Sequence, residues 1–401
     1  MRRVKYGLIG MMASVALSVQ ATAQSGLVDN VLLEWRATLS ACGQSAFGES
    51  YTMRDLDAAT HVAMFEAINA IERKYKPFTG AIQASAGSSP IAAAAQAAHD
   101  VLVATCGERS GAFERALTQS LERVPDERSR ADGRAVGRTA ARAVLDARVN
   151  SGANGPIGYW PAPSPGRYVA TSQFRGREWA TMTPWIMRRP DEMRPPPPPS
   201  VESEVFRRDV AEVQRVGGAR GSERTALQTN IAQFWAPRDV RLVARQLIGL
   251  PGRSLVDDAR FLALVEMAWA DSFIAMMDAK HAYMFWRPIT AIQSTAAAGS
   301  AAASWEPLLG TPPHPEYPCG HCLSAGAVGA VIAAEFGAKM PALIVEDGDR
   351  MLRRYTDIMQ YVDEVTISRM WAGLHYRFSN EAGKAAGMAI GRAAPQRLLT
   401  K

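Results

Sequence analysis

Residues 311–322 read TPPHPEYPCGHC, and the rest of the chain is best interpreted outward from them. Four prolines stiffen this approach, and after His321 the sequence becomes small and apolar, which predicts a helix that starts there. The backbone N–H groups of Cys319, Gly320 and His321 would then lie at a helix start, where unpaired donors favour a bound anion. The sequence therefore predicts the floor of an oxyanion site.

Two basic segments, 280–288 and 368–375, bracket this stretch. Lys280 and Arg287 are seven positions apart, so on a continuous helix they would project from one side, about 10 Å apart along the axis. Pro288 ends such a helix, which places Arg287 in its last turn or just beyond it. The aromatic residues between the two cations favour a partly buried wall, where unpaired cations need an anion. A solvated basic face is the alternative.

The second basic segment contains Arg369 and His375, which are six residues apart. On an unbroken helix this spacing would place them on nearly opposite sides. If both face one ligand, the backbone must turn between them, and Gly373 is the natural place for that turn. Taken alone, His375 is more typical of a hydrogen-bonded core histidine than of a ligand, and the same holds for His314.

The first residues have the form of a secretory signal peptide. A basic start, an apolar run from Leu8 to Val19 and the sequence Ala-Thr-Ala ending at Ala23 predict cleavage there and a periplasmic or secreted protein. Because the apolar run is too short to span a bilayer, no stable membrane anchor is expected. An uncleaved anchor is the alternative.

Composition fits a large folded protein, since 47% of the residues are hydrophobic. The net charge of +6 is modest and the arginines are dispersed, so no nucleic-acid partner is expected. The four cysteines, Cys42, Cys106, Cys319 and Cys322, permit three pairings of two disulfides. The tetrapeptide CGHC also occurs in disulfide isomerases, but the prolines before Cys319 oppose the strand that such a redox site requires. A local structural disulfide is favoured over a redox catalyst, and the pairing of the four cysteines stays open.

Helical periodicity dominates the chain and predicts an all-α fold of helical bundles. The expected order is a signal peptide at 1–23, an N-terminal helical region at 24–150, a proline-rich ordered crossing at 151–200, and a C-terminal helical region at 201–401 that carries the site. Individual helices are predicted at 53–73, 90–106, 126–149, 201–236, 238–248, 255–283, 322–336, 341–367 and 380–393.

The three segments together resemble a known signature. Lys280-x6-Arg287-Pro288, Pro318-Cys319-Gly320-His321 and Ser368-Arg369-x5-His375 are similar to the motif shared by vanadium-dependent haloperoxidases, bacterial class A acid phosphatases and the phosphatidic acid phosphatase family. Further similarity, at 278–292, 311–318 and the N-terminal helices, narrows the resemblance to the bacterial vanadium haloperoxidase-like branch. It covers nearly the whole mature chain.

The resemblance implies a helical-bundle fold that holds vanadate, with phosphate able to occupy the same site. Lys280, Arg287 and Arg369 would neutralise the anion, and Cys319 and the Gly320 amide would occupy donor positions. His375 would bind the metal, and His321 would be the acid/base. The partners implied are hydrogen peroxide, a halide and a small organic acceptor, with Lys280 polarising the peroxide. Related proteins often form dimers, so a homodimer is a further expectation.

Two residues depart from the family pattern. The family has serine where this chain has Cys319, and a disulfide with Cys322 would remove that side-chain donor. The family's aspartate four residues after the ligand histidine is Ser379 here. In phosphatases this aspartate orients the nucleophilic imidazole, so its absence favours the peroxidase, although Asn380 could substitute. His314 occupies a position where bromide-preferring members tend to carry histidine, which favours bromide or iodide.

Three functions remain as hypotheses. The first is a vanadate-dependent haloperoxidase that oxidises halide with hydrogen peroxide to a hypohalous species. The second is an acid phosphatase-type phosphomonoesterase with His375 as nucleophile. The third is an anion-binding homologue whose catalysis is impaired by Cys319 and Ser379.

Overall fold

The structure is a computed structural model that describes residues 30–42, 50–107, 110–151, 162, 164–170, 176–337, 339–346 and 352–398. The predicted signal peptide, 1–23, lies outside these residues. Within them the chain is mostly helical, as predicted, with one small two-stranded sheet. A search of the same residues finds no helix with the length and apolar character needed to cross a bilayer.

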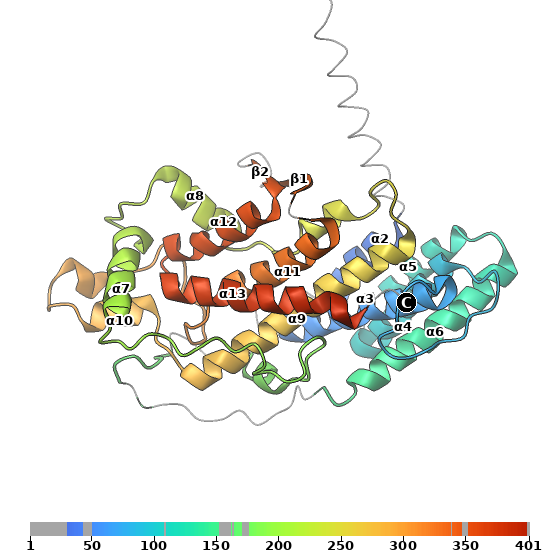
Figure 1. Ribbon diagram of the computed structural model, residues 1–401, viewed down its shortest axis with the longest axis horizontal. Helices are drawn as coiled ribbons and strands as arrows, with labels where there is room; N and C mark the ends of the chain where they lie inside the picture. Colours follow the sequence, from blue (N-terminus) through green and yellow to red (C-terminus); the bar gives the residue numbers. More distant parts are fainter. Residues whose placement is uncertain are drawn as a thin grey trace, which may run out of the picture.

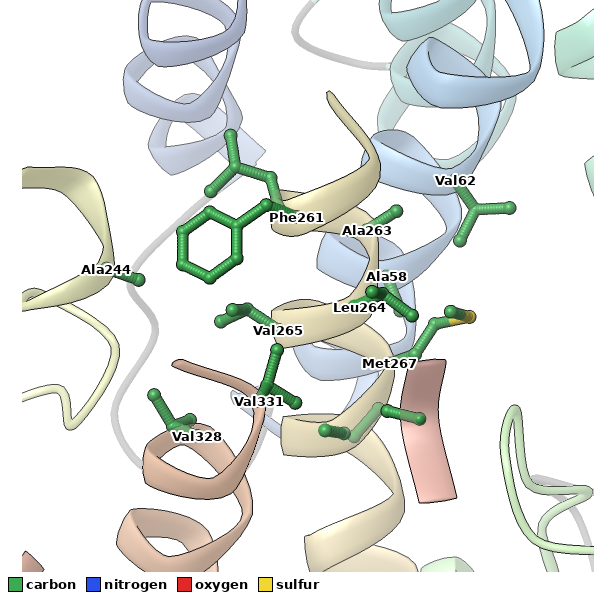
Figure 2. Packing of buried hydrophobic residues seen from close by; sticks show 14 of the residues in the cluster. Ala58, Val62, Ala244, Phe261, Ala263, Leu264, Val265, Met267, Val328 and Val331 are labelled. Atoms are coloured by element: carbon green, nitrogen blue, oxygen red, sulfur yellow. The ribbon is translucent and has the colours of Figure 1, made fainter. Parts of the chain in front are cut away.

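The long helix α9, Leu255–Tyr283, runs through the centre of the molecule (Figure 1). It packs against α3, Ser50–Glu72, and against α11, Gly320–Phe336. Figure 2 shows its residues Phe261 and Val265 among side chains from these neighbours. Because apolar residues surround nearly its whole length, α9 belongs to one continuous core that includes both halves of the chain.

The other helices form two groups along α9. The N-terminal group contains α3 with α2, Val31–Leu39, α4, Pro90–Cys106, α5, Ser110–Glu122, and α6, Glu127–Arg148. The C-terminal group contains α11 with α7, Glu204–Gly217, α8, Ala226–Trp235, α10, Pro288–Ser294, α12, Ile358–Trp371, and α13, Arg377–Ala393. Short 3₁₀ turns lie at Ser40–Cys42, Arg177–Thr181, Ala244–Leu247, Ala301–Ser304 and Ala394–Arg397.

Several helix starts follow from side-chain capping. Ser89 accepts a hydrogen bond from the Ala92 amide and Pro90 occupies the first turn, as the sequence predicts for α4. Ser254 and Asp257 form a reciprocal capping box that fixes the start of α9. A disulfide between Cys42 and Cys106 joins the segment after α2 to the end of α4.

Helices α11 and α13 approach each other closely because glycines of α13 face the backbone of α11. A Cβ atom added at Gly387 would lie 1.9 Å from the Leu323 carbonyl oxygen, and one at Gly391 would lie 2.2 Å from the Ala327 oxygen. Any side chain at either position would push the helices apart. This contact fixes α13, and with it the segment that precedes it, against the start of α11.

The predicted helix at 341–367 is wrong over its first half. Residues Lys339–Glu346 form strand β1 and Leu352–Asp357 form strand β2, an antiparallel pair. Leu343 and Val345 are buried and alternate with the less buried Ala342, Ile344 and Glu346, so a period of two governs this segment. The predicted helices at 238–248 and 201–236 are also corrected, because the first contains only a 3₁₀ turn and the second divides into α7 and α8.

The described part of the proline-rich crossing is fastened to α9 by polar contacts. The Asp271 carboxylate accepts hydrogen bonds from the amides of Trp185, Ile186 and Met187 at 2.7–2.9 Å. Further along, Arg194 donates twice to Asp278 at 2.7 Å. These buried acceptors replace the backbone partners that an irregular segment cannot supply to itself.

Replacing Asp271 with alanine is expected to lower the free energy of unfolding by about 3 kcal/mol or more, because three buried amides would lose their acceptor. Denaturant unfolding followed by circular dichroism measures this change. The control is Asp146→Ala on α6, where the carboxylate pairs with Arg142 in solvent and should contribute less than about 0.5 kcal/mol. Equal effects for the two variants would contradict the anchoring role.

Candidate active site

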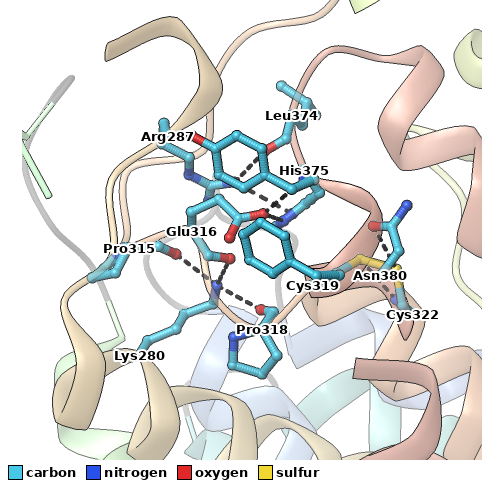
Figure 3. Close-up of polar contacts among 12 residues, drawn as sticks. Lys280, Arg287, Pro315, Glu316, Pro318, Cys319, Cys322, Leu374, His375 and Asn380 are labelled. Carbon is cyan, nitrogen blue, oxygen red and sulfur yellow. Dashed lines mark hydrogen bonds and ion pairs between the residues drawn. A yellow bond between two sulfur atoms is a disulfide. The ribbon is translucent and has the colours of Figure 1, made fainter. Parts of the chain in front are cut away.

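The three segments singled out in the sequence meet in one place, where Lys280, Arg287 and His375 lie around the loop that contains Glu316 (Figure 3). The end of α9 contributes Lys280, the segment before α10 contributes Arg287, and the turn between α12 and α13 contributes His375. The loop 314–319 lies among them and leads into α11. The predicted convergence of Lys280, Arg287 and His375 is therefore present in the structure.

Lys280 holds the loop in place. Its ammonium nitrogen lies 2.6 Å from the Pro315 oxygen, 2.7 Å from the Glu316 oxygen and 2.8 Å from the Pro318 oxygen. Three acceptors use all three N–H donors of an ammonium group. Burial and the charge of Arg287 lower the pKa of Lys280, whereas the three carbonyls favour its charged form. The sequence predicts that Lys280 donates to the anion, but in this arrangement its donors go to the loop.

Arg287 does not continue the helix that carries Lys280. Met284 adopts the left-handed conformation, with φ 46° and ψ 44°, and ends α9. Arg287 is therefore the residue before α10. Its side chain contacts the loop 314–319, which Lys280 also contacts. Its Nε donates to the His314 oxygen at 3.0 Å, and its Nη1 donates to the Leu374 oxygen at 3.0 Å.

The turn predicted at Gly373 is present and brings His375 to the site. Gly373 has φ 78°, a conformation that L side chains rarely adopt, and it lies against the backbone of Gly217. His375 follows this turn and is only 2% exposed. Its Nε2 lies 3.3 Å from Arg287 Nη1. Because a guanidinium can only donate, Nε2 is the nitrogen that carries the lone pair.

Arg369, on α12, completes the group of buried cations and is 3% exposed. Its Nε and Nη1 have no hydrogen-bond partner among the residues that the structure describes. Burial and the neighbouring charge of Arg287 lower the pKa of Arg369 to about 10, so it remains charged at neutral pH. Buried guanidinium donors without acceptors are unfavourable unless a ligand supplies the acceptors.

Glu316 is the functional residue that the sequence interpretation missed. It is fully buried, and its Oε1 lies 2.8 Å from His375 Nδ1 and 3.2 Å from the Tyr376 amide (Figure 3). Burial raises the pKa of Glu316 to about 7, against the opposing charges of Lys280 and Arg287. The available signal was an acidic residue within the stretch 311–322 itself.

At the start of α11, one of the backbone donors predicted to be unpaired has an acceptor. Helix α11 begins at Gly320, with Cys319 as its capping residue. The Cys319 amide, predicted to be an unpaired donor, instead donates to the Ser379 oxygen at 3.3 Å. Gly320 lies in the first turn, where the helix supplies no acceptor for its amide. A Cβ at Gly320 would lie 2.3 Å from the Met276 sulfur of α9, so a larger residue here would require the flexible Met276 side chain to shift.

Cys319 and Cys322 form a disulfide, as preferred from the sequence. Both residues are fully buried, so a partner thiol has no access to the sulfurs. The Cys319 sulfur accepts a hydrogen bond from the Cys322 amide at 3.2 Å and caps the helix. Cys319 therefore has no side-chain donor to offer an anion.

Two further histidines lie near the cations. His314 is half-buried, and its Nδ1 lies 3.0 Å from Arg287 Nη2. Burial, together with Lys280, Arg287 and then His321, lowers the pKa of His314 well below its ordinary value. His321 is half-buried in the first turn of α11, as predicted for the acid/base.

The whole site is electropositive. Burial and the charges of Arg287, Lys280 and Arg369 lower the pKa of His375 well below its ordinary value, so its imidazole is neutral. Three buried cations thus face one buried carboxylate, that of Glu316. Excess buried positive charge favours a bound anion and repels a bare cation. Among the described residues, no group of three histidine, cysteine or acidic side chains is placed to hold a metal ion.

Comparison with known proteins relates the C-terminal part of this chain to a family of domains. Residues 260–400 match the model of the VCPO second helical-bundle domain. A vanadium chloroperoxidase of Curvularia inaequalis is 23% identical over a match that covers 32% of this chain and 29% of that protein. The chain thus spans less than a third of that relative's length. The match to the family model covers less than half of the chain, so it shows a similarity of residues 260–400 to that domain.

Solved structures show the same fold over most of the chain. A structure described as the first bacterial vanadium-dependent iodoperoxidase superposes with a TM-score of 0.77 at 22% identity, covering 92% of this chain and 97% of the other. A bacterial vanadium-dependent chloroperoxidase in its holo form gives a TM-score of 0.73 at 16% identity, covering 89% and 94%. The predicted vanadium haloperoxidase-type helical fold is confirmed.

The residues of the site fit an oxyanion such as vanadate. The unpartnered donors of Arg369 supply charged hydrogen bonds, the first turn of α11 supplies an amide, and His375 Nε2 supplies a lone pair. An imidazole is a suitable ligand for a transition metal when its other nitrogen is held by an acceptor. Glu316 provides that acceptor at Nδ1.

Replacing Cys319 with serine and Cys322 with alanine is expected to strengthen binding of vanadate by about 2- to 10-fold, because a hydroxyl would regain the donor that the disulfide removes. Isothermal calorimetry on vanadate-free protein measures the change. The control removes the other disulfide, with alanine at Cys42 and Cys106, and should leave the affinity unchanged. Weaker binding by the serine variant would contradict this account of Cys319.

Proposed function

We propose that the protein is a vanadate-dependent haloperoxidase that oxidises a halide with hydrogen peroxide to a hypohalous species. The single observation that carries the proposal is the buried Arg369 guanidinium, whose Nε and Nη1 lack acceptors among the described residues, near the His375 imidazole, whose Nε2 carries a lone pair and accepts from Arg287 in this structure. A bound oxyanion would accept hydrogen bonds from the Arg369 guanidinium. The metal centre of that oxyanion would bind the lone pair of His375 Nε2.

Each residue has a distinct task in this proposal. Arg369 and Arg287 neutralise the oxygens of the anion, and His375 Nε2 binds its metal centre. Vanadate, when bound, supplies a Lewis-acidic centre that activates hydrogen peroxide for oxygen transfer to halide. His321, in the first turn of α11, holds and transfers a proton. Lys280 holds the loop 314–319 in place through hydrogen bonds to its carbonyl oxygens and adds a positive charge to the site. The resemblance implied instead that Lys280 contacts the anion directly.

Bromide or iodide is the proposed halide. His314 is half-buried beside Arg287, and its position carries histidine in bromide-preferring relatives. One of the similar structures is described as an iodoperoxidase, although others are chloroperoxidases. We further propose a periplasmic or secreted location, which the two disulfides support, since such bonds persist in oxidising compartments.

The test is halogenation by protein that has been freed of metal and then supplied with vanadate. Bromination and iodination of a phenolic acceptor are followed with hydrogen peroxide, with and without vanadate, beside a chloride reaction. Vanadate-dependent turnover with bromide or iodide is expected. Absence of vanadate-dependent turnover with every halide would overturn the proposal.

A phosphomonoesterase is the second candidate, and one observation favours it. The sequence argument against it was the absence of an aspartate at Ser379, but Glu316 supplies a carboxylate to His375 Nδ1. His375 Nε2 could then attack phosphorus as an oriented nucleophile. Hydrolysis of p-nitrophenyl phosphate, lost in His375→Ala, would support this function. Inhibition by vanadate does not discriminate, because both functions predict vanadate binding, and inertness in both assays would support the impaired homologue.

A further inference from the structure

The contact between Glu316 and His375 has a defined direction of hydrogen bonding. Arg287 Nη1 lies 3.3 Å from His375 Nε2 and can only donate, so Nε2 is an acceptor. A neutral imidazole with an acceptor Nε2 carries its hydrogen on Nδ1. Nδ1 must therefore donate to Glu316 Oε1, which lies 2.8 Å away. Two contacts on opposite sides of the ring thus require the same tautomer.

The backbone of Glu316 is fixed on both sides, which makes the carboxylate a rigid partner. Its amide donates to the Phe285 oxygen at 2.9 Å, and its carbonyl accepts from Lys280 at 2.7 Å. Its Oε1 also accepts from the Tyr376 amide at 3.2 Å, so one oxygen binds both the ring and the backbone that follows it. The ring of His375 can neither rotate nor exchange tautomers without breaking these bonds.

We propose that Glu316 is the positioning residue of His375, supplying from the loop before α11 the carboxylate that the family pattern places four residues after the histidine. At that later position this chain has Ser379, which is fully buried and cannot act as an anion. In this chain the carboxylate that contacts the ligand histidine therefore comes from a different segment than in the family pattern. The inference rests on the proposed function, in which His375 Nε2 contacts the bound oxyanion.

The electrostatic setting explains why one carboxylate is suitable here. Glu316 is the acidic residue against His375, and Lys280, Arg287 and Arg369 face the same ring with positive charge. A second carboxylate at Ser379 would bring two like charges into one buried space. Serine at this position is therefore compatible with Glu316 and does not mark a lost function.

The first test is the tautomer of His375 in protein without vanadate. The chain has six histidines, so ¹⁵N-histidine labelling gives few signals, and His375→Gln assigns the relevant one. We expect a protonated Nδ1 with a slowly exchanging, strongly hydrogen-bonded proton, and this proton signal should disappear in Glu316→Met. A wild-type His375 that is protonated at Nε2 would overturn the proposal.

The second test is oxyanion affinity measured by calorimetry with vanadate and, separately, with inorganic phosphate. Glu316→Gln, which keeps the shape but removes the charge, is expected to weaken vanadate binding by about 10- to 100-fold, and Glu316→Asp should recover part of it. The matched control is Glu66→Gln, a buried glutamate on α3 that binds the amides of Phe78 and Thr79. Binding by Glu316→Gln within twofold of wild type would overturn the positioning role.

Failure of the proposed haloperoxidase function and failure of the positioning role of Glu316 give different experimental results. If halogenation is absent but the tautomer is as expected and Glu316→Gln weakens oxyanion binding, Glu316 positions His375 and the haloperoxidase function is wrong. If halogenation is present and unaffected in Glu316→Gln, the haloperoxidase function stands and the positioning role is wrong. Thermal unfolding of Glu316→Asp and Glu66→Gln shows whether a loss of affinity comes from a loss of folding.

Discussion

Replacing His375 with alanine is expected to lower vanadate-dependent bromide oxidation by about 10³-fold or more. His375 Nε2 is the nitrogen that would bind the metal centre, and in the structure the ring is held from both sides by Arg287 and Glu316. Alanine removes the ligand and leaves the Glu316 carboxylate without its main partner. Steady-state halogenation and calorimetric binding of vanadate to the same preparations measure the two effects.

The control for this substitution is a buried histidine outside the site. His99 on α4 contacts Asp100 and Glu114 and is 8% exposed. His99→Ala should affect stability and leave turnover per folded molecule within about twofold of wild type, since no ligand contact is lost. Turnover of His375→Ala within tenfold of wild type would show that the imidazole is not the ligand.

Replacing Arg369 with methionine is expected to change binding and stability in opposite directions. Without an anion, removing a buried charge that lacks partners at Nε and Nη1 should raise the free energy of unfolding by about 1–4 kcal/mol. With an anion, the lost charged hydrogen bonds should weaken vanadate binding by about 10²- to 10³-fold. Denaturant unfolding of the vanadate-free protein and calorimetry measure the two quantities.

A buried arginine whose partners are present serves as the control. Arg260 on α9 donates to the Leu398 oxygen at 2.6 Å and to Glu335 at 2.8 Å. Arg260→Met should therefore lower the free energy of unfolding by about 3 kcal/mol, because the buried acceptors lose their donor. If Arg369→Met also destabilises the vanadate-free protein, the guanidinium has a structural partner and the argument for a bound oxyanion fails.

The helices were predictable where a local signal coincided with long periodicity. Ser89 and Pro90 marked the start of α4, and the apolar pattern gave α9 its bounds of 255–283. The turn at Gly373 was also predictable, because a spacing of six residues between Arg369 and His375 cannot face one ligand on a straight helix. In these cases the determining interactions lie within one or two helical turns.

The errors lie where distant residues decide the outcome. Leu343 and Tyr355 face each other across the strand pair, and neither strand shows this partner in its own sequence. The acceptors that occupy Lys280 are backbone carbonyls some 35 positions later, which no side-chain pattern reveals. Glu316 was missed for a related reason, since its role depends on a histidine 59 residues further along the chain.

The central position of helix α9 affects how cooperatively the molecule unfolds. It packs on α3 in the N-terminal group and on α11 in the C-terminal group, and one apolar cluster runs from Val31 to Leu398. Separating the groups would strip one side of a helix that is buried almost throughout, so neither group has a complete interior without it. We therefore expect a single heat-absorption peak in calorimetry, with calorimetric and van't Hoff enthalpies that agree.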